Sequence, residues 1–380
     1  MRIPLSAPDI DESDIEAVAG VLRGTRLSLG PKLEEFEQAA ANYAGVPYGV
    51  ALASGTAGLH LGLAALGIGE GDEVILPSFT FISVANAVLH QRARPVFADI
   101  DPRTLNLTAE SVAKAITPRT RVIIAVDTFG CPVDLDPILR LAAAHGLKVI
   151  EDACEALGAE YRGKRAGGLG DLGVFAFYPN KPITTGEGGM VVTRDRELAE
   201  TIRALRNQGR RPSDGWLDHS LLGYNYRLSE INCALGVSQL RRIDSILARR
   251  ESRAACYYEH LRAVPELTLP VRTLAEGRVC WFVFVVRLAD RFRREDRDGI
   301  LSYMAGRGIE CGRYFAPVHR QPLYAAYADR GRDLAVTERV APRTLALPFF
   351  NRLTSGEIAE VCLALREAIG TVGRGAAQAS

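Results

Sequence analysis

The stretch 174-VFAFYPNKPITTGEGGM-190 shows how one strand of this protein ends. Its apolar run breaks off into a proline, an asparagine and Lys181, and three glycines follow before the next apolar run begins. Polar and glycine residues after a short apolar run predict a strand that ends in a loop. Lys181 is therefore predicted to lie just beyond a strand end.

Upstream of this stretch, short β-branched runs alternate with helical patterns. The apolar runs are VPYGVAL, DEVILP, RPVFADI, RVIIAVDTF and LKVIEDA, and the helical patterns between them include GTAGLHLGLAALG, SVANAVLHQ and DPILRLAAAHG. Strands that alternate with helices predict an α/β fold with a mostly parallel sheet, covered on both faces. Ligands of such sheets gather at the carboxyl ends of the strands, so residues just after the apolar runs are the candidates for a site.

Downstream, the sequence changes character. Residues 228–261 form a long helical pattern that we expect to bridge two domains, and mixed α+β patterns follow. We expect a large domain over residues 1–245 and a smaller α+β domain over 246–380, with the N-terminal segment 1–25 packing on the smaller domain. The Gly/Ala/Ser-rich tail after residue 372 is expected to be disordered.

Composition excludes several classes of protein. The 380 residues carry a formal net charge of +1, which argues against a nucleic acid or an anionic membrane as partner. The seven cysteines are odd in number and contain no CxxC pair, which indicates a reducing compartment without disulfides or a metal site. The N-terminus lacks a signal peptide, and no apolar run is long enough to span a membrane. We therefore expect a cytoplasmic protein.

Residues 168-GLGDLG-173 match the dinucleotide-binding pattern G-x-G-x-x-G. That pattern binds a pyrophosphate only when a buried strand precedes it and a helix follows it. Here a charged turn precedes it and an apolar strand follows it. A tight glycine turn is the better interpretation.

Two further strand ends carry polar groups. In 54-SGTAGLHLGLAALG-67 a helix start offers free backbone N–H groups, a hydroxyl and a glycine, which could hold a phosphate, although Ser54 as a simple N-cap is the commoner explanation. His60 in that helix is expected only to pack or to lie at the surface. Glu151 and Asp152 end a buried strand, where a carboxylate needs a cation or a protonated heterocycle as partner, or else serves as a cap or in a structural ion pair.

Taken together, a phosphate cradle, a buried carboxylate and an amine at one sheet edge match the needs of pyridoxal 5′-phosphate (PLP). The cradle would hold the phosphate, the acid would keep the pyridine nitrogen protonated, and the Lys181 amine would bond to the cofactor. Phe79 or Phe81, after another strand, could cover the ring. Alone, each feature has a structural explanation, and Lys181 could simply point into solvent.

At this point the chain resembles the DegT/DnrJ/StrS family of PLP-dependent sugar-nucleotide aminotransferases. The resemblance implies the aspartate-aminotransferase type I fold, with a mostly parallel sheet of the seven-stranded type in the large domain and a smaller α+β C-terminal domain. The resemblance runs from LSAPDI to about residue 370. It rests on GPKLEEFE, SGTAGL, GDEVILPSFTF, FADIDP, VIEDACEALGA, FYPNK, ITTGEGG, GYNYRLSEINCALG and PVHRQPLY, in this order. The perosamine-synthase branch of the family is the most similar in the EDA-x-E-A and ITTGEGGM segments.

The resemblance implies roles for individual residues. Lys181 would bond to PLP and move protons, and Asp152 would face the pyridine nitrogen. The other implied cofactor contacts are the phosphate-binding Gly55, Thr56 and Ala57, the ring-stacking Phe81, Glu155 near the ring hydroxyl, and Asn225, which would reach the phosphate of a neighbouring subunit in a homodimer. Tyr314 and His319 match the segment that lines the sugar-nucleotide pocket.

Two positions depart from the family pattern. Ala176 stands where relatives usually have a serine that donates to the phosphate, so one hydrogen bond of about 1 kcal/mol should be missing. Pro182 stands where many relatives carry Asn or Gln. Both departures bear on cofactor affinity and leave the class of reaction unchanged.

The function implied is transfer of an amino group from L-glutamate to C4 of a nucleotide-linked 4-keto-6-deoxyhexose, with GDP favoured over UDP and dTDP, for polysaccharide biosynthesis. The C4 position follows from 183-ITTGEGG-189, which 4-keto enzymes of the family tend to carry. The alternatives are a C3 aminotransferase acting on a dTDP- or UDP-linked 3-keto sugar, a PLP-dependent sugar dehydratase, and a regulatory protein that retains the fold. Lys181 argues against the last two, since such a dehydratase has histidine there and a regulator would be expected to lose the lysine.

Overall fold

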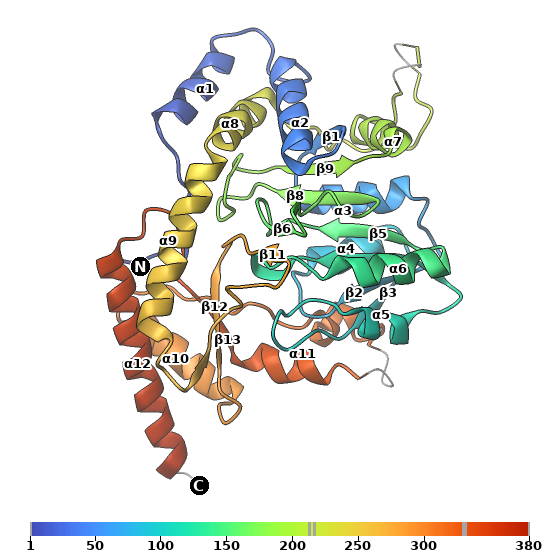
Figure 1. Cartoon of the computed structure of the whole chain (residues 1–380). Helices are drawn as coiled ribbons and strands as arrows, with labels where there is room; N and C mark the ends of the chain where they lie inside the picture. The colour runs from blue at the N-terminus through green and yellow to red at the C-terminus, as the bar shows by residue number, and fades with distance from the viewer. Residues whose placement is uncertain (1, 212–213, 216–217, 329–332, 379–380) are drawn as a thin grey trace.

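A computed structural model describes residues 2–211, 214–215, 218–328 and 333–378, and its centre is a seven-stranded sheet with strand order β1-β9-β8-β5-β4-β2-β3 (Figure 1). The strands are β1 (Tyr48–Leu52), β2 (Glu73–Pro77), β3 (Arg94–Ala98), β4 (Thr120–Val126), β5 (Lys148–Asp152), β8 (Leu172–Ala176) and β9 (Gly189–Thr193). Only β9 is antiparallel to its neighbours in this sheet. The predicted α/β fold with a mostly parallel sheet is confirmed.

Alternation along the strands explains why helices cover both faces of this sheet. In β2, Val74 and Leu76 pack in one core while Ile75 packs in the core on the opposite face. The first face carries α3 (Gly55–Ala65), α4 (Ser83–His90) and α7 (Arg196–Arg206). The opposite face carries α5 (Ala109–Ala115), α6 (Leu135–His145), α2 (Pro31–Ala44) and α8 (Glu230–Arg241). Both faces are buried, as a parallel sheet requires.

The glycine pattern at 168–173 is a tight turn, as predicted. It leads directly into β8, so a strand follows it where a dinucleotide site would need a helix. A Cβ on Gly173 would lie 1.9 Å from the Gly167 carbonyl oxygen, and one on Gly168 would lie 2.4 Å from that of Ala44. Glu151 accepts a hydrogen bond from Leu169 N–H at 3.0 Å, so the buried carboxylate beside Asp152 holds this turn.

The bridging helix predicted over 228–261 is in fact two helices, α8 and α9 (Ile243–Leu261), which break at Arg242. The guanidinium of Arg242 bonds the Asp9 carbonyl oxygen at 3.0 Å and Asp14 Oδ2 at 2.6 Å. Periodicity alone could not reveal the break, because the residues that bind Arg242 lie at the other end of the chain.

A second core lies beyond this break. A three-stranded antiparallel sheet of β10 (Leu267–Thr268), β12 (Phe284–Leu288) and β13 (Thr344–Leu347) packs with α9, α10 (Arg294–Gly306) and α12 (Ser355–Gln378). The segment between α10 and β13, which includes α11 (Ala335–Val340), returns to the large sheet, where Val318 and Tyr324 join the core under α3 and α4. The domain boundary at residue 245 stays a prediction.

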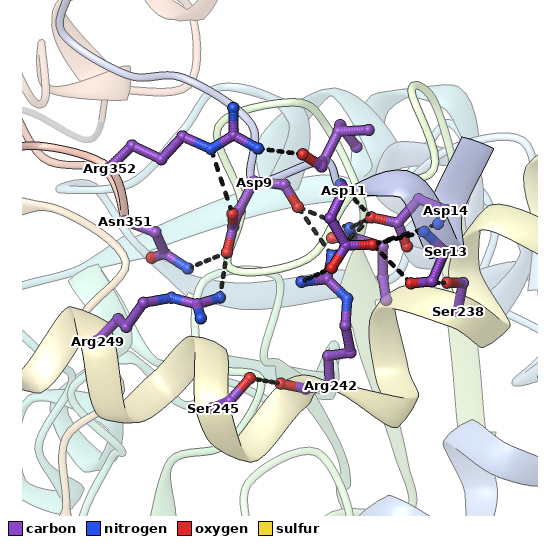
Figure 2. A network of polar contacts seen from close by, with 12 residues as sticks. Asp9, Asp11, Ser13, Asp14, Ser238, Arg242, Ser245, Arg249, Asn351 and Arg352 are labelled. Atoms are coloured by element: carbon purple, nitrogen blue, oxygen red, sulfur yellow. Dashed lines mark hydrogen bonds and ion pairs between the residues drawn. The ribbon is translucent and has the colours of Figure 1, made fainter. Parts of the chain in front are cut away.

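Residues 2–14 form an N-terminal strap that crosses both parts of the molecule. Ile3 pairs with Ile309 and is fully buried in the second core. Asp9 is bound by Arg249 and by Asn351 at 2.5 and 2.8 Å, and α1 (Glu12–Leu22) packs on α8 (Figure 2). The strap therefore joins the α8–α9 break to the segment after β13.

Further expectations concern the C-terminal tail, the cysteines, membrane spans and metal ligands. The backbone of α12 continues to Gln378, and the disorder expected after residue 372 stays a prediction. All seven cysteines are free thiols. Within the described ranges, no helix is long and apolar enough to cross a membrane, and no group of three potential ligands could hold a metal.

Candidate active site

The lysine loop, residues 177–188, carries Lys181 from the end of β8 to the start of β9. Phe177 N–H donates to the Gly188 carbonyl at 2.9 Å, and Thr185 N–H donates to the Phe177 carbonyl at 3.0 Å, so the loop is closed at its base. The Lys181 side chain is only 12% exposed. Its Nζ lies 3.7 Å from Glu155 Oε1 and 4.0 Å from the centre of the Phe282 ring. Lys181 is therefore an enclosed amine rather than a solvated one.

Asp152 ends β5 and is buried at the same edge of the sheet. Its Oδ1 accepts a hydrogen bond from Cys154 N–H at 3.1 Å. Burial raises the pKa of Asp152, whereas the hydrogen bonds from Cys154 and the nearby Lys181 ammonium act to lower it. A buried carboxylate with one nearby cation can bind a further protonated group.

Glu155 lies between the lysine and the chain after β4. Its Oε2 accepts a hydrogen bond from Phe129 N–H at 2.9 Å, while its other oxygen faces Lys181. Burial raises the pKa of Glu155, and the Lys181 ammonium and the Phe129 N–H oppose that rise. Lys181, Asp152 and Glu155 thus form one cluster at this edge of the sheet.

The start of α3 forms the adjoining wall. Ser54 Oγ accepts from Ala57 N–H at 3.1 Å, so Ser54 is an N-cap. The first N–H groups of a helix have no acceptor within it, which leaves those of Gly55 and Thr56 available to an anion. A Cβ on Gly55 would meet Ala176 Cβ at 2.8 Å and Cys154 Sγ at 2.9 Å. The helix start therefore abuts the ends of β5 and β8, where Asp152 and the lysine loop lie.

The two phenylalanines after β2 differ in environment. Phe79 is fully buried and packs against Phe129 and Phe315 with ring centres 6.0 and 5.9 Å apart. Phe81 is 58% exposed, with its ring centre 6.4 Å from that of Phe315. Of this pair, only Phe81 presents a ring that a planar ligand could contact.

The two predicted substrate residues lie in different surroundings. Tyr314 stacks on Phe315 with ring centres 5.2 Å apart; burial raises its pKa, and nearby Glu155 adds to that rise. His319 is buried, with Nδ1 2.6 Å from Ser78 Oγ and Nε2 3.2 Å from Glu338. Tyr314 therefore lies by the cluster, whereas both ring nitrogens of His319 are already used within the protein.

Asn225 is exposed and forms an isolated bridge with Asn207. Its neighbours Tyr224 and Tyr226 stack on each other and pack against His60, whose ring centre lies 4.9 Å from that of Tyr224. His60 is thus a buried packing residue, in agreement with the sequence-based expectation. A contact of Asn225 with a second subunit stays a prediction.

Sequence reasoning missed three neighbours of the cluster. Phe282 reaches Lys181 from a segment far along the chain, and no local signal marks it. Cys154 supplies the N–H to Asp152, and its place within EDACEA could have suggested this. Asn180 directly precedes the lysine and hydrogen-bonds Tyr314, while its Oδ1 is buried without a partner among the described residues.

These surroundings fit PLP. The enclosed amine can bond to an aldehyde, the buried Asp152 can face a protonated ring nitrogen, and the free N–H groups of Gly55 and Thr56 can hold a phosphate. The close approach at Gly55, where a Cβ would clash, leaves the backbone as the donor. The Asn180 oxygen adds a buried acceptor that is free to bind a ligand.

Comparisons with known proteins agree with this fit. The DegT/DnrJ/EryC1/StrS aminotransferase family matches residues 8–366. The chain is 41% identical over 369 residues to GDP-perosamine synthase of Caulobacter vibrioides, covering 97% of this chain and 98% of that one. The crystal structure of the aminotransferase TlmJ from Streptoalloteichus hindustanus superposes with a TM-score of 0.91 at 32% identity, covering 98% and 100% of the two chains.

A further solved structure bears on the cofactor. Spr1654 from Streptococcus pneumoniae, in its PLP form, superposes with a TM-score of 0.89 at 27% identity, covering 98% of this chain and all of that one. Family, fold and the lysine–carboxylate cluster lead to the same class of enzyme. The chain belongs to the DegT/DnrJ/EryC1/StrS aminotransferase family and is a PLP-dependent sugar aminotransferase.

Proposed function

We propose that this enzyme transfers the amino group of L-glutamate to C4 of a nucleotide-linked 4-keto-6-deoxyhexose, with GDP as the favoured nucleotide. The observation that carries this proposal is the 41% identity to GDP-perosamine synthase over nearly the full length of both chains. The sequence ITTGEGG after the lysine favours the same position of amination.

The structure of the lysine loop supports a selection of the reacting carbon by the position of Lys181. Thr184 and Thr185 are almost fully buried, and their hydroxyls donate to the carbonyls of Phe177 and Glu187 at 3.0 and 2.8 Å. Both hydroxyls are therefore used in hydrogen bonds within the loop. The loop would therefore select the reacting carbon by fixing the position of Lys181, since a displacement of about 1 Å can cost about a hundredfold in rate.

Each residue of the cluster has a task in this proposal. Bound PLP supplies an electron sink that lets a proton leave the carbon bearing nitrogen. The Lys181 amine would take that proton from one carbon and return it to another, acting as base and then as acid. Asp152 would keep the ring nitrogen protonated, and Glu155 would hold the ammonium form of Lys181 between transfers.

The test is a direct assay of position and nucleotide. The purified enzyme with PLP and L-glutamate is incubated with GDP-, UDP- and dTDP-linked 4-keto-6-deoxyhexoses, and the new amine is located by NMR. We expect nitrogen at C4, fastest turnover with GDP, and no turnover by Lys181→Ala. Nitrogen at C3, or activity only on a 3-keto sugar, would contradict the proposed position while leaving the enzyme class intact.

A further inference from the structure

Two amide side chains of α8 hold the lysine loop from one side. Asn232 and Gln239 lie about two helical turns apart and so on the same face of the helix. Asn232 Nδ2 donates to the Thr185 carbonyl at 2.5 Å and to the Glu187 carbonyl at 3.4 Å. Gln239 Oε1 accepts from Thr184 N–H at 3.4 Å. The loop that carries Lys181 is thus bound to α8 at adjoining residues.

Gln239 has a second set of partners on the N-terminal strap. Its side chain is fully buried, and Nε2 donates to the Asp9 carbonyl at 2.9 Å and to Asp14 Oδ2 at 2.6 Å. The partner of Oε1 is an N–H and the partners of Nε2 are oxygens, so only one orientation of the amide satisfies all three. One side chain therefore connects the strap to the lysine loop.

The strap is itself held by charge on its other side. The Asp14 side chain is fully buried and pairs with Arg242 at 2.6 Å, while Arg249 binds Asp9 (Figure 2). A buried carboxylate without a cation partner destabilises the folded state. The ion pair with Arg242 therefore keeps Asp14 in its buried position. Docking of the strap fixes the position of Gln239 Nε2, and thereby the position of its Oε1 beneath Thr184.

We propose that Gln239 is a positioning residue for Lys181, through which the docked N-terminal strap fixes the lysine loop. The loop's own hydrogen bonds close its base, while Gln239 and Asn232 fix it against α8. What this positioning achieves in catalysis rests on the proposed function of Lys181. The mechanical coupling between strap and loop does not, and it can be measured in the cofactor-free protein.

The test is hydrogen–deuterium exchange of the cofactor-free protein, measured on a peptide covering residues 182–188. Gln239→Met keeps the volume but removes all three hydrogen bonds, and we expect exchange in this peptide to become about two- to tenfold faster. The matched control is Thr337→Val, which removes a buried hydroxyl that donates to Asp99 at 2.7 Å and lies on α11 rather than on α8 or the lysine loop. Equal exchange in Gln239→Met, wild type and the control would overturn the proposal.

Asp14→Ala tests the strap itself, because it leaves Gln239 and Thr184 unchanged. We expect faster exchange in the same peptide, by a smaller factor than in Gln239→Met. Unchanged exchange in Asp14→Ala would show that the strap does not act on the loop, and would overturn that half of the proposal.

A spectroscopic measurement on the loaded protein separates positioning from simple stability. If Gln239 positions the lysine, the absorption band of PLP bound to Lys181 should change its pH dependence in Gln239→Met and not in Thr337→Val. An unchanged pH profile beside a lowered melting temperature would reduce Gln239 to a structural residue. Failure of the wild type to bond PLP would count against the proposed function and would leave the exchange result standing.

Discussion

At the scale of single residues, Ala176 replaces the serine that relatives usually carry, and a substitution can restore that hydroxyl. Its Cβ adjoins the start of α3, close to where a phosphate would bind. Ala176→Ser should add one donor to the phosphate and tighten PLP binding about fivefold, equivalent to roughly 1 kcal/mol. Titration of the cofactor-free enzyme with PLP, followed by absorbance, measures the dissociation constant. Ala176→Gly, which adds no donor, is the control, and an unchanged dissociation constant in the serine variant would refute the placement of the phosphate.

His60 gives a prediction about pH. Burial lowers its pKa to about 4, and the neighbouring His90 adds to that effect. Between its ordinary value of 6.5 and about 4, the unfolded chain binds a proton that the folded protein does not, so stability falls as the pH falls through this window. In His60→Phe, the loss of melting temperature between pH 7 and 5 should be smaller than in wild type, by about 2 °C or more. Parallel losses in both proteins would show that His60 does not titrate on unfolding.

At the scale of elements, the start of α3 depends on the absence of a side chain at Gly55. Gly55→Ala would push a methyl group against Ala176 and Cys154 and displace the N–H groups that would hold the phosphate. We expect PLP to bind about tenfold more weakly or worse, while the protein remains folded by circular dichroism. Gly69→Ala is the matched control, since a Cβ there has nothing within 4 Å. If both variants bind PLP equally well, α3 does not hold the cofactor.

The sequence predicted those elements whose signals are local. Continuous apolar runs such as Val74, Ile75 and Leu76, which alternate with helical patterns, predicted the covered sheet. The rule that ligands gather at the carboxyl ends of strands brought Asp152 and Lys181 to one edge. The sequence could not reveal the break between α8 and α9, nor the ring of Phe282 that lies against the Lys181 amine. Both depend on contacts between distant segments, which leave no trace in local periodicity.

At the scale of the whole molecule, the resemblance implies a dimer with shared sites. Lys181→Ala and Asn225→Ala should each be inactive alone. Mixing the two under conditions of subunit exchange should restore activity to about a quarter of wild type or less, because a mixed dimer can carry one intact site. The measurement is turnover of the mixture, with subunit exchange verified by mass spectrometry. No recovery despite exchange would show that Asn225 serves its own subunit.

The N-terminal strap also constrains the order in which the protein can fold during its synthesis. Ile3 and Asp9 are translated well before their partners Ile309, Arg249 and Asn351. Domains generally fold from the N-terminus as the chain is made, but this strap cannot dock fully until residue 351 has been made. A product that ends between residues 249 and 309 would contain Gln239, Arg242 and Arg249, but it would leave Ile3 without Ile309 and Asp9 without Asn351.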